Sequence, residues 1–199
     1  MNNRLYRNCL LLLLTVLLAG LTERMQAQTR NRQSVHTNSY DVPPAVPEML
    51  VFAGDTIRFD RADLRERMDR ELIAFSYMHT NSHLVIKRAN RLFPVVEPIL
   101  KEYGIPDDLK YLMVIESNLD PKSLSSAGAA GLWQFVQSTG REYGLEVNAN
   151  IDERYNTKKA TVAACKYLAE AYQKYGNWMT VAASYNGGQN GISRRLEEQ

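Results

Sequence analysis

The sequence predicts an all-α protein. Apolar residues recur at the three- and four-residue spacing of helices in several stretches. No window after residue 60 shows the sustained polar–apolar alternation that is typical of strands. Glycines at positions 104 and 176 follow two of the periodic stretches, where a helix C-terminus favours them. We therefore expect one helical domain of roughly 140 residues behind a leader.

Residues 1–28 have the composition of a signal peptide. A basic start precedes the largely apolar run Leu10–Leu21, which is shorter than the roughly 20 residues needed to cross a membrane. Cys9 precedes this run instead of following it, so the pattern of a lipid-anchored product is absent. We expect cleavage near Ala27 or Gln28 and export of the remaining chain, with an uncleaved anchor as the alternative.

Removal of the signal peptide leaves a neutral chain. Residues 1–28 hold three arginines and one glutamate, so 21 basic and 21 acidic side chains remain. Because there is no basic excess, we expect no nucleic-acid partner. Cys165 is then the only cysteine, which excludes an intramolecular disulfide, and its small apolar neighbours predict a buried thiol.

The chain before the helical domain falls into two parts. Residues 29–59 are polar and then proline-rich, which predicts a linker that is mostly disordered. Residues 60–97 are expected to form an N-terminal helical extension. Its first helix is expected over residues 61–78, with Asp60 as the cap and with one charged and one apolar side.

A second helical stretch of this extension is expected over residues 82–103. Pro94 and Pro98 lie within it and are expected to interrupt it. His79 and His83 have the i, i+4 spacing of a metal-binding pair, but no third ligand is near them in the sequence. We therefore expect no metal site, and no other cofactor is indicated.

The central stretch is Tyr111–Ser117, an apolar run that contains one carboxylate. Its helix is expected to begin at Pro106 and to close at Asp120, which places Glu116 near the C-terminal end. Glu116 falls within the apolar stripe, so its carboxyl is expected to be partly desolvated. Desolvation and the helix C-terminus both disfavour the charged form, which predicts a raised pKa and suits a general acid. A buried glutamate that caps backbone or pairs with an arginine is the alternative.

Three more helices are expected downstream. Gly131–Phe135 follows a stretch of small residues and is expected to open a helix that ends near a later glycine. The longest helix is expected over residues 158–175, capped by Asn156 or Thr157. A short apolar helix is expected over residues 178–185, with an asparagine as its cap.

Three short motifs follow one another in this part of the chain: Glu116-Ser117, then Gly131-Leu132-Trp133-Gln134, then Ser184-Tyr185-Asn186-Gly187-Gly188. With Gly104-Ile105-Pro106 before the first and Ser138-Thr139-Gly140 after the second, they cover about residues 98–195. In these motifs the chain resembles the lytic transglycosylases of the soluble-lytic-transglycosylase type, in particular the membrane-bound murein transglycosylase D branch. The resemblance implies a lysozyme-like α-helical catalytic domain over residues 98–199.

The resemblance also implies an activity. Such enzymes cleave the MurNAc-GlcNAc β-1,4 bond of peptidoglycan glycan strands and leave a 1,6-anhydro-MurNAc end, so glycan strands are the expected partner. The expected place is the periplasm or cell envelope, which is compatible with peripheral membrane association. The implied roles are Glu116 as acid and then base; Ser125, Gln134 and Asn186 as hydrogen-bonding groups for the sugar; Tyr185 as a partner of Glu116; and Ser117 as a residue that orients it. Trp133 suits either packing or a sugar platform.

Some features depart from the family pattern or leave alternatives open. Ser184 stands where the family usually has alanine, a small change that should be tolerated, and the chain ends at Gln199, so the catalytic domain is expected to be C-terminally truncated. No second carboxylate is evident, because Asp120 suits a turn and Asp152 and Glu153 fall in a loop where water can solvate them. A lysozyme-type muramidase and a non-catalytic peptidoglycan-binding protein remain as alternatives.

Overall fold

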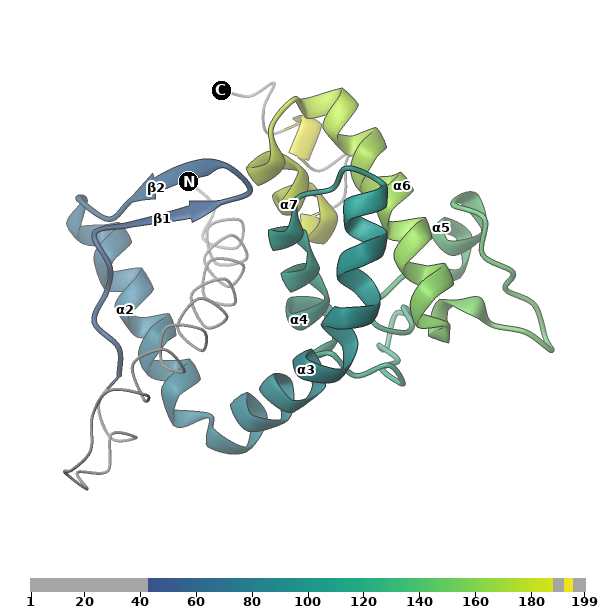
Figure 1. Ribbon diagram of the computed structural model, residues 1–199, viewed down its shortest axis with the longest axis horizontal. Helices are drawn as coiled ribbons and strands as arrows, with labels where there is room; N and C mark the ends of the chain where they lie inside the picture. The colour runs from purple at the N-terminus through teal and green to yellow at the C-terminus, as the bar shows by residue number, and fades with distance from the viewer. Residues whose placement is uncertain (1–42, 188–191, 195–199) are drawn as a thin grey trace.

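The helix α6 (Thr157–Tyr175) lies at the centre of the fold. In the computed structural model, which describes residues 43–187 and 192–194, α6 packs against α3 and α7 (Figure 1). Its buried residues are mostly alanines, which let the neighbouring helices approach closely. The other elements are β1 (Met49–Phe52), β2 (Asp55–Arg58), α2 (Ala62–Tyr77), α3 (His79–Glu102), η1 (Asp107–Tyr111), α4 (Leu112–Ser117), α5 (Gln137–Glu142), η2 (Glu153–Tyr155) and α7 (Trp178–Gly187). The predicted all-α, lysozyme-like class is confirmed, with one short hairpin added.

That hairpin lies within residues 29–59, where the sequence predicts a mostly disordered linker. β1 and β2 pair antiparallel, and the turn residues Ala53 and Gly54 both have positive φ, as a type I′ turn requires. Phe52 is buried in the core, and the Ala53 amide donates to the Asp108 carboxylate at 2.7 Å. Two strands of four residues joined by Ala-Gly are too short and too unusual at the turn to be recognised in the sequence.

The two helices of the extension are present with different ends from those predicted. α2 begins after Arg61, and no side chain caps it, so Asp60 does not have the predicted role. α3 runs without interruption through Pro94 and Pro98 and is the longest helix of the described chain, 24 residues against 19 for α6. Figure 1 shows that α3 bends instead of breaking, which is how a packed helix accommodates proline.

The helix predicted from residue 106 to residue 120 is divided. Pro106 is the N-cap of the 3₁₀ helix η1, and the true α-helix α4 begins only at Leu112. α4 ends at Ser117, because Asn118 and Leu119 turn into the left-handed region with φ values of 50° and 55°. Glu116 is therefore the next-to-last residue of a helix of six residues.

The C-terminal helices begin where the sequence predicts. The Asn156 side chain accepts from the Lys159 amide at the start of α6, and Gly176 ends this helix with φ 65°. The Asn177 side chain caps α7 by accepting from the Thr180 amide at 2.9 Å. Cys165 is buried as predicted, and burial raises the pKa of its thiol to about 12. Within the described ranges, none of these helices combines the length and the apolar character that a membrane span requires.

Candidate active site

The carboxyl of Glu116 is half-buried at the C-terminal end of α4. Among the described residues its side-chain partner is an amide: Asn186 Nδ2 on α7 donates to Oε1 at 3.2 Å. Burial raises the pKa of Glu116 above its ordinary value of 4.5, and the Asn186 hydrogen bond, which favours the charged form, only partly offsets this. Among residues 43–187 and 192–194 no basic side chain pairs with it. The predicted pKa direction is confirmed, and none of the arginines that the structure describes pairs with Glu116.

Ser117 holds the end of α4 in place through backbone contacts. Its buried hydroxyl lies 2.8 Å from the Met113 carbonyl and 2.9 Å from the Leu132 carbonyl, both of which accept from it. The second contact joins α4 to the turn at 131–134. The bonds of Ser117 thus reach backbone and not the Glu116 carboxyl, so any orienting effect on that carboxyl acts through the position of the helix end.

The second motif forms a turn and does not open a helix, contrary to the prediction. Gly131 and Gln134 have φ values of 75° and 50°, and α5 begins only at Gln137. A Cβ at Gly131 would lie 2.0 Å from the Arg154 carbonyl oxygen, so only glycine fits there. Gln134 Nε2 donates to the Gly131 carbonyl at 2.8 Å and to the Ser123 carbonyl at 3.3 Å, which closes the turn on itself.

Ser125 lies at the start of the adjoining loop. Its hydroxyl accepts from the Ala129 amide at 3.0 Å, and its own amide donates to the Ala129 carbonyl at 2.9 Å. The side chain is half-buried. Ser125 therefore stabilises the tight turn that leads into the second motif.

The aromatic residues of the second and third motifs pack against each other, with the ring centres of Trp133 and Tyr185 6.1 Å apart. Tyr185 donates a hydrogen bond from its hydroxyl to the Trp133 carbonyl at 2.8 Å. It is therefore near Glu116 but is not hydrogen-bonded to it. Burial raises the pKa of Tyr185 well above its ordinary value, and the charge of Glu116 adds to the shift. Trp133 is fully buried and its indole donates to Thr161 at 3.0 Å, which makes it a packing residue and not a sugar platform.

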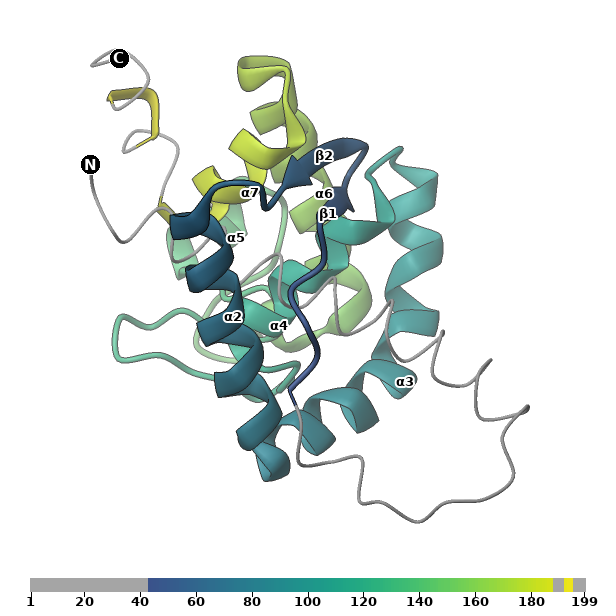
Figure 2. The same ribbon diagram turned by 90° about the vertical axis from the view of Figure 1, so that its left-hand side faces the viewer.

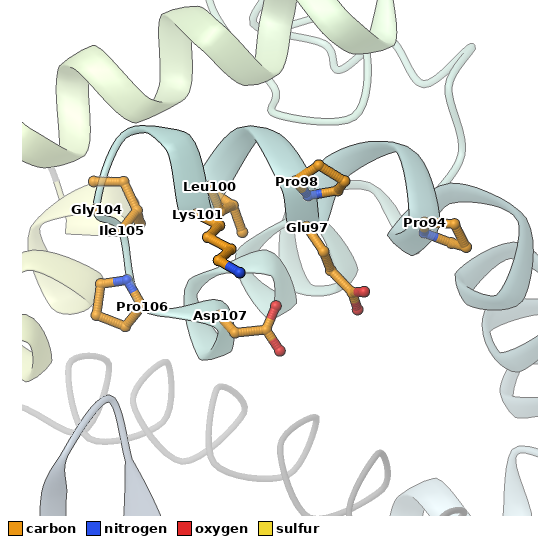
Figure 3. Close-up of a pocket in the computed structure, with 9 residues that line it drawn as sticks. All are labelled: Pro94, Glu97, Pro98, Leu100, Lys101, Gly104, Ile105, Pro106 and Asp107. Carbon is orange, nitrogen blue, oxygen red and sulfur yellow. The ribbon is translucent and has the colours of Figure 1, made fainter.

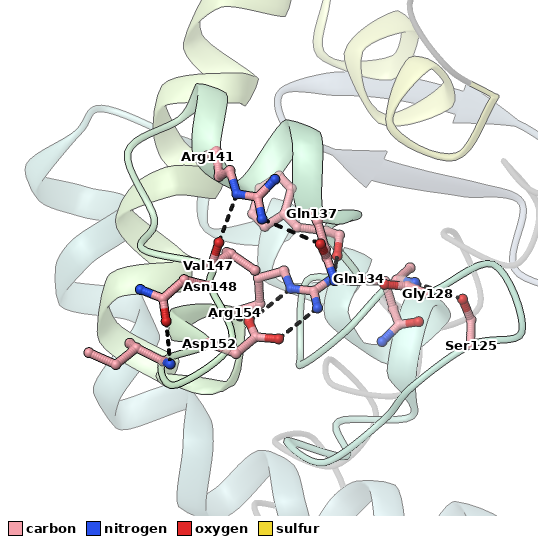
Figure 4. Close-up of polar contacts among 12 residues, drawn as sticks. Ser125, Gly128, Gln134, Gln137, Arg141, Val147, Asn148, Asp152 and Arg154 are labelled. Carbon is pink, nitrogen blue, oxygen red and sulfur yellow. Dashed lines mark hydrogen bonds and ion pairs between the residues drawn. The ribbon is translucent and has the colours of Figure 1, made fainter.

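Arg154 stabilises the loop at residues 128–135, a role that the sequence analysis does not predict. Its guanidinium, only 3% exposed, binds Asp152 through Nε at 2.9 Å and Nη2 at 2.6 Å (Figure 4). Nη1 donates to the carbonyls of Gly128 at 2.7 Å and Phe135 at 2.9 Å. One side chain thus ties together both ends of the segment that contains Gln134. A charged tripeptide in a loop usually indicates a solvated surface, so the sequence held no signal for this role.

The other acids near the motifs are engaged elsewhere. Asp120 accepts from the Lys122 amide at 3.0 Å and pairs with Arg88 at 3.1 Å, which confirms its predicted role in a turn. Asp152 and Glu153 were expected to be solvated. They are ion-paired instead, Asp152 with Arg154, and Glu153 with a lysine on α6. The pKa of Asp152 is held below its ordinary value, first by the hydrogen bond from Arg154.

Three further observations complete the description of the surroundings. Within the part of the chain that the structure describes, no three His, Cys, Asp or Glu side chains gather as a metal site would need. An open pocket of about 710 Å³ lies between the second half of α3 and the start of η1, bordered by Pro98, Lys101 and Asp107 (Figure 3). Its lining includes none of the predicted site residues. Ser184, the departure from the family pattern, is buried with its hydroxyl bonded to the Val181 carbonyl at 2.8 Å, so α7 accommodates it.

Comparison with known proteins supports the resemblance that the three motifs indicate. Residues 96–199 match the model of the family described as "Transglycosylase SLT domain". The chain is 30% identical over 154 residues to the membrane-bound lytic murein transglycosylase D of Escherichia coli K12, which covers 75% of this chain and 33% of that protein. It is 30% identical over 124 residues to the membrane-bound lytic murein transglycosylase C of Pectobacterium atrosepticum, covering 54% of this chain and 34% of that one.

A more distant relative is the putative tributyltin chloride resistance protein of an Alteromonas species, 24% identical over 106 residues, with 53% of this chain and 51% of that one covered. The chain spans about a third of the length of the two transglycosylases. The family match covers more than half of the chain and includes all three motifs. The protein therefore belongs to the transglycosylase SLT family.

Proposed function

We propose that this protein is a peptidoglycan lytic transglycosylase. It cleaves the MurNAc-GlcNAc β-1,4 bond of glycan strands and leaves a 1,6-anhydro-MurNAc end, with Glu116 as the catalytic residue. The supporting observation is the setting of Glu116, a half-buried carboxyl with a raised pKa whose side-chain partner among the described residues is a neutral amide. Such a carboxyl holds its proton at a higher pH than an ordinary glutamate, which a general acid requires.

The reaction takes place in two proton transfers at one carboxyl. Glu116 first donates its proton to the glycosidic oxygen while the bond from that oxygen to MurNAc C1 breaks, which frees the 4-hydroxyl of GlcNAc. The carboxylate then takes the proton of the MurNAc 6-hydroxyl as O6 bonds to C1. Glu116 ends protonated, as it began, and no water is consumed. The first transfer leaves the residue in the form that the second requires, so one carboxyl suffices.

The charges around the site support a single-carboxyl reaction over a two-carboxylate hydrolysis. An ordinary glycosidase holds two carboxyl groups about 5–9.5 Å apart. Asp120 and Asp152, the sequence candidates for a second acid, are both ion-paired to arginines. We propose that the N-acetyl group of the substrate meets the positive charge that develops at C1.

The remaining motif residues are proposed as the surroundings of the bound sugar. Asn186 is exposed and bonded to the catalytic carboxyl, so it can contact both Glu116 and substrate. Ser125 and Gln134 lie in the turns that Arg154 ties together, and their remaining hydrogen-bonding capacity is proposed to bind the sugar and its N-acetyl group. Tyr185 and Ser117 fix the second motif against α7 and α4.

We propose further that the chain is exported to the periplasm or cell envelope and acts there on the glycan strands. The signal peptide expected over residues 1–28 lies outside the described residues. Residues 98–199 are proposed as the catalytic domain and residues 60–97 as a helical extension. The hairpin amide bond to Asp108 and the bond from Asn177 to Asp55 at 2.9 Å attach the preceding hairpin to this domain.

The test is mass spectrometry of the soluble products that residues 29–199 release from purified peptidoglycan. We expect muropeptides lighter by one water than hydrolytic products, and release slower by at least about 100-fold with Glu116→Gln. Glu102→Gln, which changes an exposed glutamate on α3, is the matched control and should behave like the wild type. Products with reducing ends would identify a muramidase instead. A folded wild-type chain that binds the polymer but releases nothing would identify a binding protein.

A further inference from the structure

The corner where α2 meets α3 projects from the rest of the molecule. Figures 1 and 2 differ by a quarter turn about the vertical axis, and in both the corner is the lowest part of the described chain. The end of α2 and the start of α3 therefore form a tip of the described chain. The hydroxyl of Ser82 closes the corner by bonding to the carbonyls of Phe75 at 2.8 Å and Met78 at 3.0 Å.

Large apolar side chains are exposed at this corner. Ile73 is 39% exposed, Tyr77 58%, Met78 49% and Leu84 44%. Ile73 and Tyr77 are four residues apart on α2 and so share a face, and Met78 lies at the junction itself. Single exposed apolar residues are ordinary, but four of them within twelve residues at a projecting tip mark an interaction surface.

The charged residues on the α3 side of the corner are basic, whereas Asp69 and Glu71 precede Ile73 on the α2 side. Residues 72–96 contain no aspartate or glutamate, whereas they contain three basic residues and two histidines. His83, Lys87 and Arg91 recur every four residues, so they follow one face of α3, and all three are exposed. The third basic residue, Arg88, is paired with Asp120 from another part of the fold. The exposed apolar corner is thus followed along α3 by two exposed basic residues, Lys87 and Arg91, on the face that also carries His83.

From this arrangement we infer that the corner, defined here as Ile73, Tyr77, Met78 and Leu84 with His83, Lys87 and Arg91, contacts the surface of an anionic phospholipid bilayer. Apolar side chains at a projecting tip enter the boundary between headgroups and acyl chains, and tyrosine is favoured at that depth. Lysine and arginine next to the tip meet the headgroup phosphates. A folded protein partner would need a groove shaped to this tip, whereas a fluid bilayer adapts to it. A glycan strand offers no acyl region for the apolar residues.

The test is co-sedimentation of residues 29–199, which include every described residue, with vesicles. Binding to phosphatidylcholine vesicles containing a quarter phosphatidylglycerol is expected at low salt, and weaker binding to pure phosphatidylcholine. Lys87→Glu with Arg91→Glu should lower the partition coefficient by at least about tenfold, because each basic residue near an anionic surface contributes appreciably to binding. Tyr77→Ser with Met78→Ser should lower it by about fivefold or more through lost apolar burial.

Two matched controls make the same chemical changes elsewhere. Lys122→Glu with Lys158→Glu alters exposed lysines away from the corner, and Leu124→Ser with Ile151→Ser alters apolar residues that are 63% and 45% exposed. Both controls should bind vesicles like the wild type, and circular dichroism should show all four variants folded. Vesicle binding that the corner variants and the controls reduce equally would overturn the inference. So would a wild type that binds isolated peptidoglycan but no vesicles, because the partner would then be the polymer.

Discussion

Glu116 and Asp152 are carboxylates of the same domain held in opposite ways. Glu116 lies at a helix C-terminus, is half-buried and has a neutral amide for its side-chain partner, so its pKa is raised. Asp152 receives two hydrogen bonds from the buried guanidinium of Arg154, so its pKa is lowered. Burial thus favours the protonated form of Glu116, whereas the hydrogen bonds from Arg154 favour the ionised form of Asp152.

The difference teaches that the surroundings of an acid, and not its distance from the motifs in the sequence, decide its role. Each acid is linked to the loop of the second motif through another residue. Arg154, which binds Asp152, donates to the Phe135 carbonyl, and Ser117, which follows Glu116, donates to the Leu132 carbonyl. When two acids have environments that push their pKa values apart, the one kept neutral is the candidate general acid. The other serves the scaffold.

The largest expected effect separates the two carboxylates by activity. Glu116→Gln should lower the rate of product release by about 10²–10⁴-fold, because it removes the proton that the leaving oxygen needs. Asp152→Asn should leave most of the turnover at a temperature where it is folded. Assays of both variants on the same peptidoglycan check this. Equal losses in two folded variants would mean that Asp152 takes part in the chemistry.

The next effect concerns Arg154 and stability. Arg154→Met should lower the free energy of unfolding by about 3–5 kcal/mol, because it leaves a carboxylate and two carbonyls without their partner. Arg154→Lys keeps the charge but not the forked geometry and should lose less. Urea unfolding curves measure both. If Arg154→Met lost under about 1 kcal/mol, the guanidinium would not be holding the loop.

The two carboxylates should also give stability opposite dependences on pH. The lowered pKa of Asp152 means that its contribution is present above its ordinary value of 3.8 and is lost as the pH falls through the folded-state pKa. The raised pKa of Glu116 means that the folded state is favoured below 4.5 and that this advantage is lost as the pH rises through the folded-state pKa.

Asp152→Asn should therefore cost about 2 kcal/mol at neutral pH, the value of hydrogen bonds to a charged group, and less in acid. Glu116→Gln should be at least as stable as the wild type at neutral pH, with the difference vanishing in acid. Unfolding midpoints measured across the pH range for both variants test this. Two curves that diverge from the wild type in the same direction would show that the contrast is wrong.

The smallest expected effect is that of Asn186→Ala. Its amide favours the charged form of Glu116, so removing it should raise the pKa of Glu116 further and move the alkaline limb of the pH–rate profile upward. The rate at the optimum should fall by about tenfold or less, the value of one hydrogen bond. Asn148→Ala, which changes an exposed loop asparagine, should leave the profile unchanged. A limb that moved downward would mean that Asn186 does not donate to the carboxylate.

The structure around Glu116 could be predicted from the sequence to a greater extent than the loop that Arg154 holds. The raised pKa of Glu116 could be predicted, because an acid within an apolar stripe is desolvated wherever the helix packs. The caps by Asn156 and Asn177 are local, so they too could be predicted. The turn at Gly131–Gln134 could not, because its Leu-Trp-Gln run suits a helix, whereas the turn depends on the close approach of Gly131 to the distant backbone of Arg154. The burial of Arg154 depends on carbonyls about 20 residues earlier, which no local pattern indicates.

The most direct test is a ¹³C NMR titration of the side-chain carboxyls of Glu116 and Asp152 in one sample of residues 29–199. Each signal is assigned by its loss in Glu116→Gln or Asp152→Asn. The account predicts that Glu116 titrates above its ordinary value of 4.5 and Asp152 below its ordinary value of 3.8. A Glu116 that titrates at or below its ordinary value would contradict the claim that the fold keeps this carboxyl as the acid.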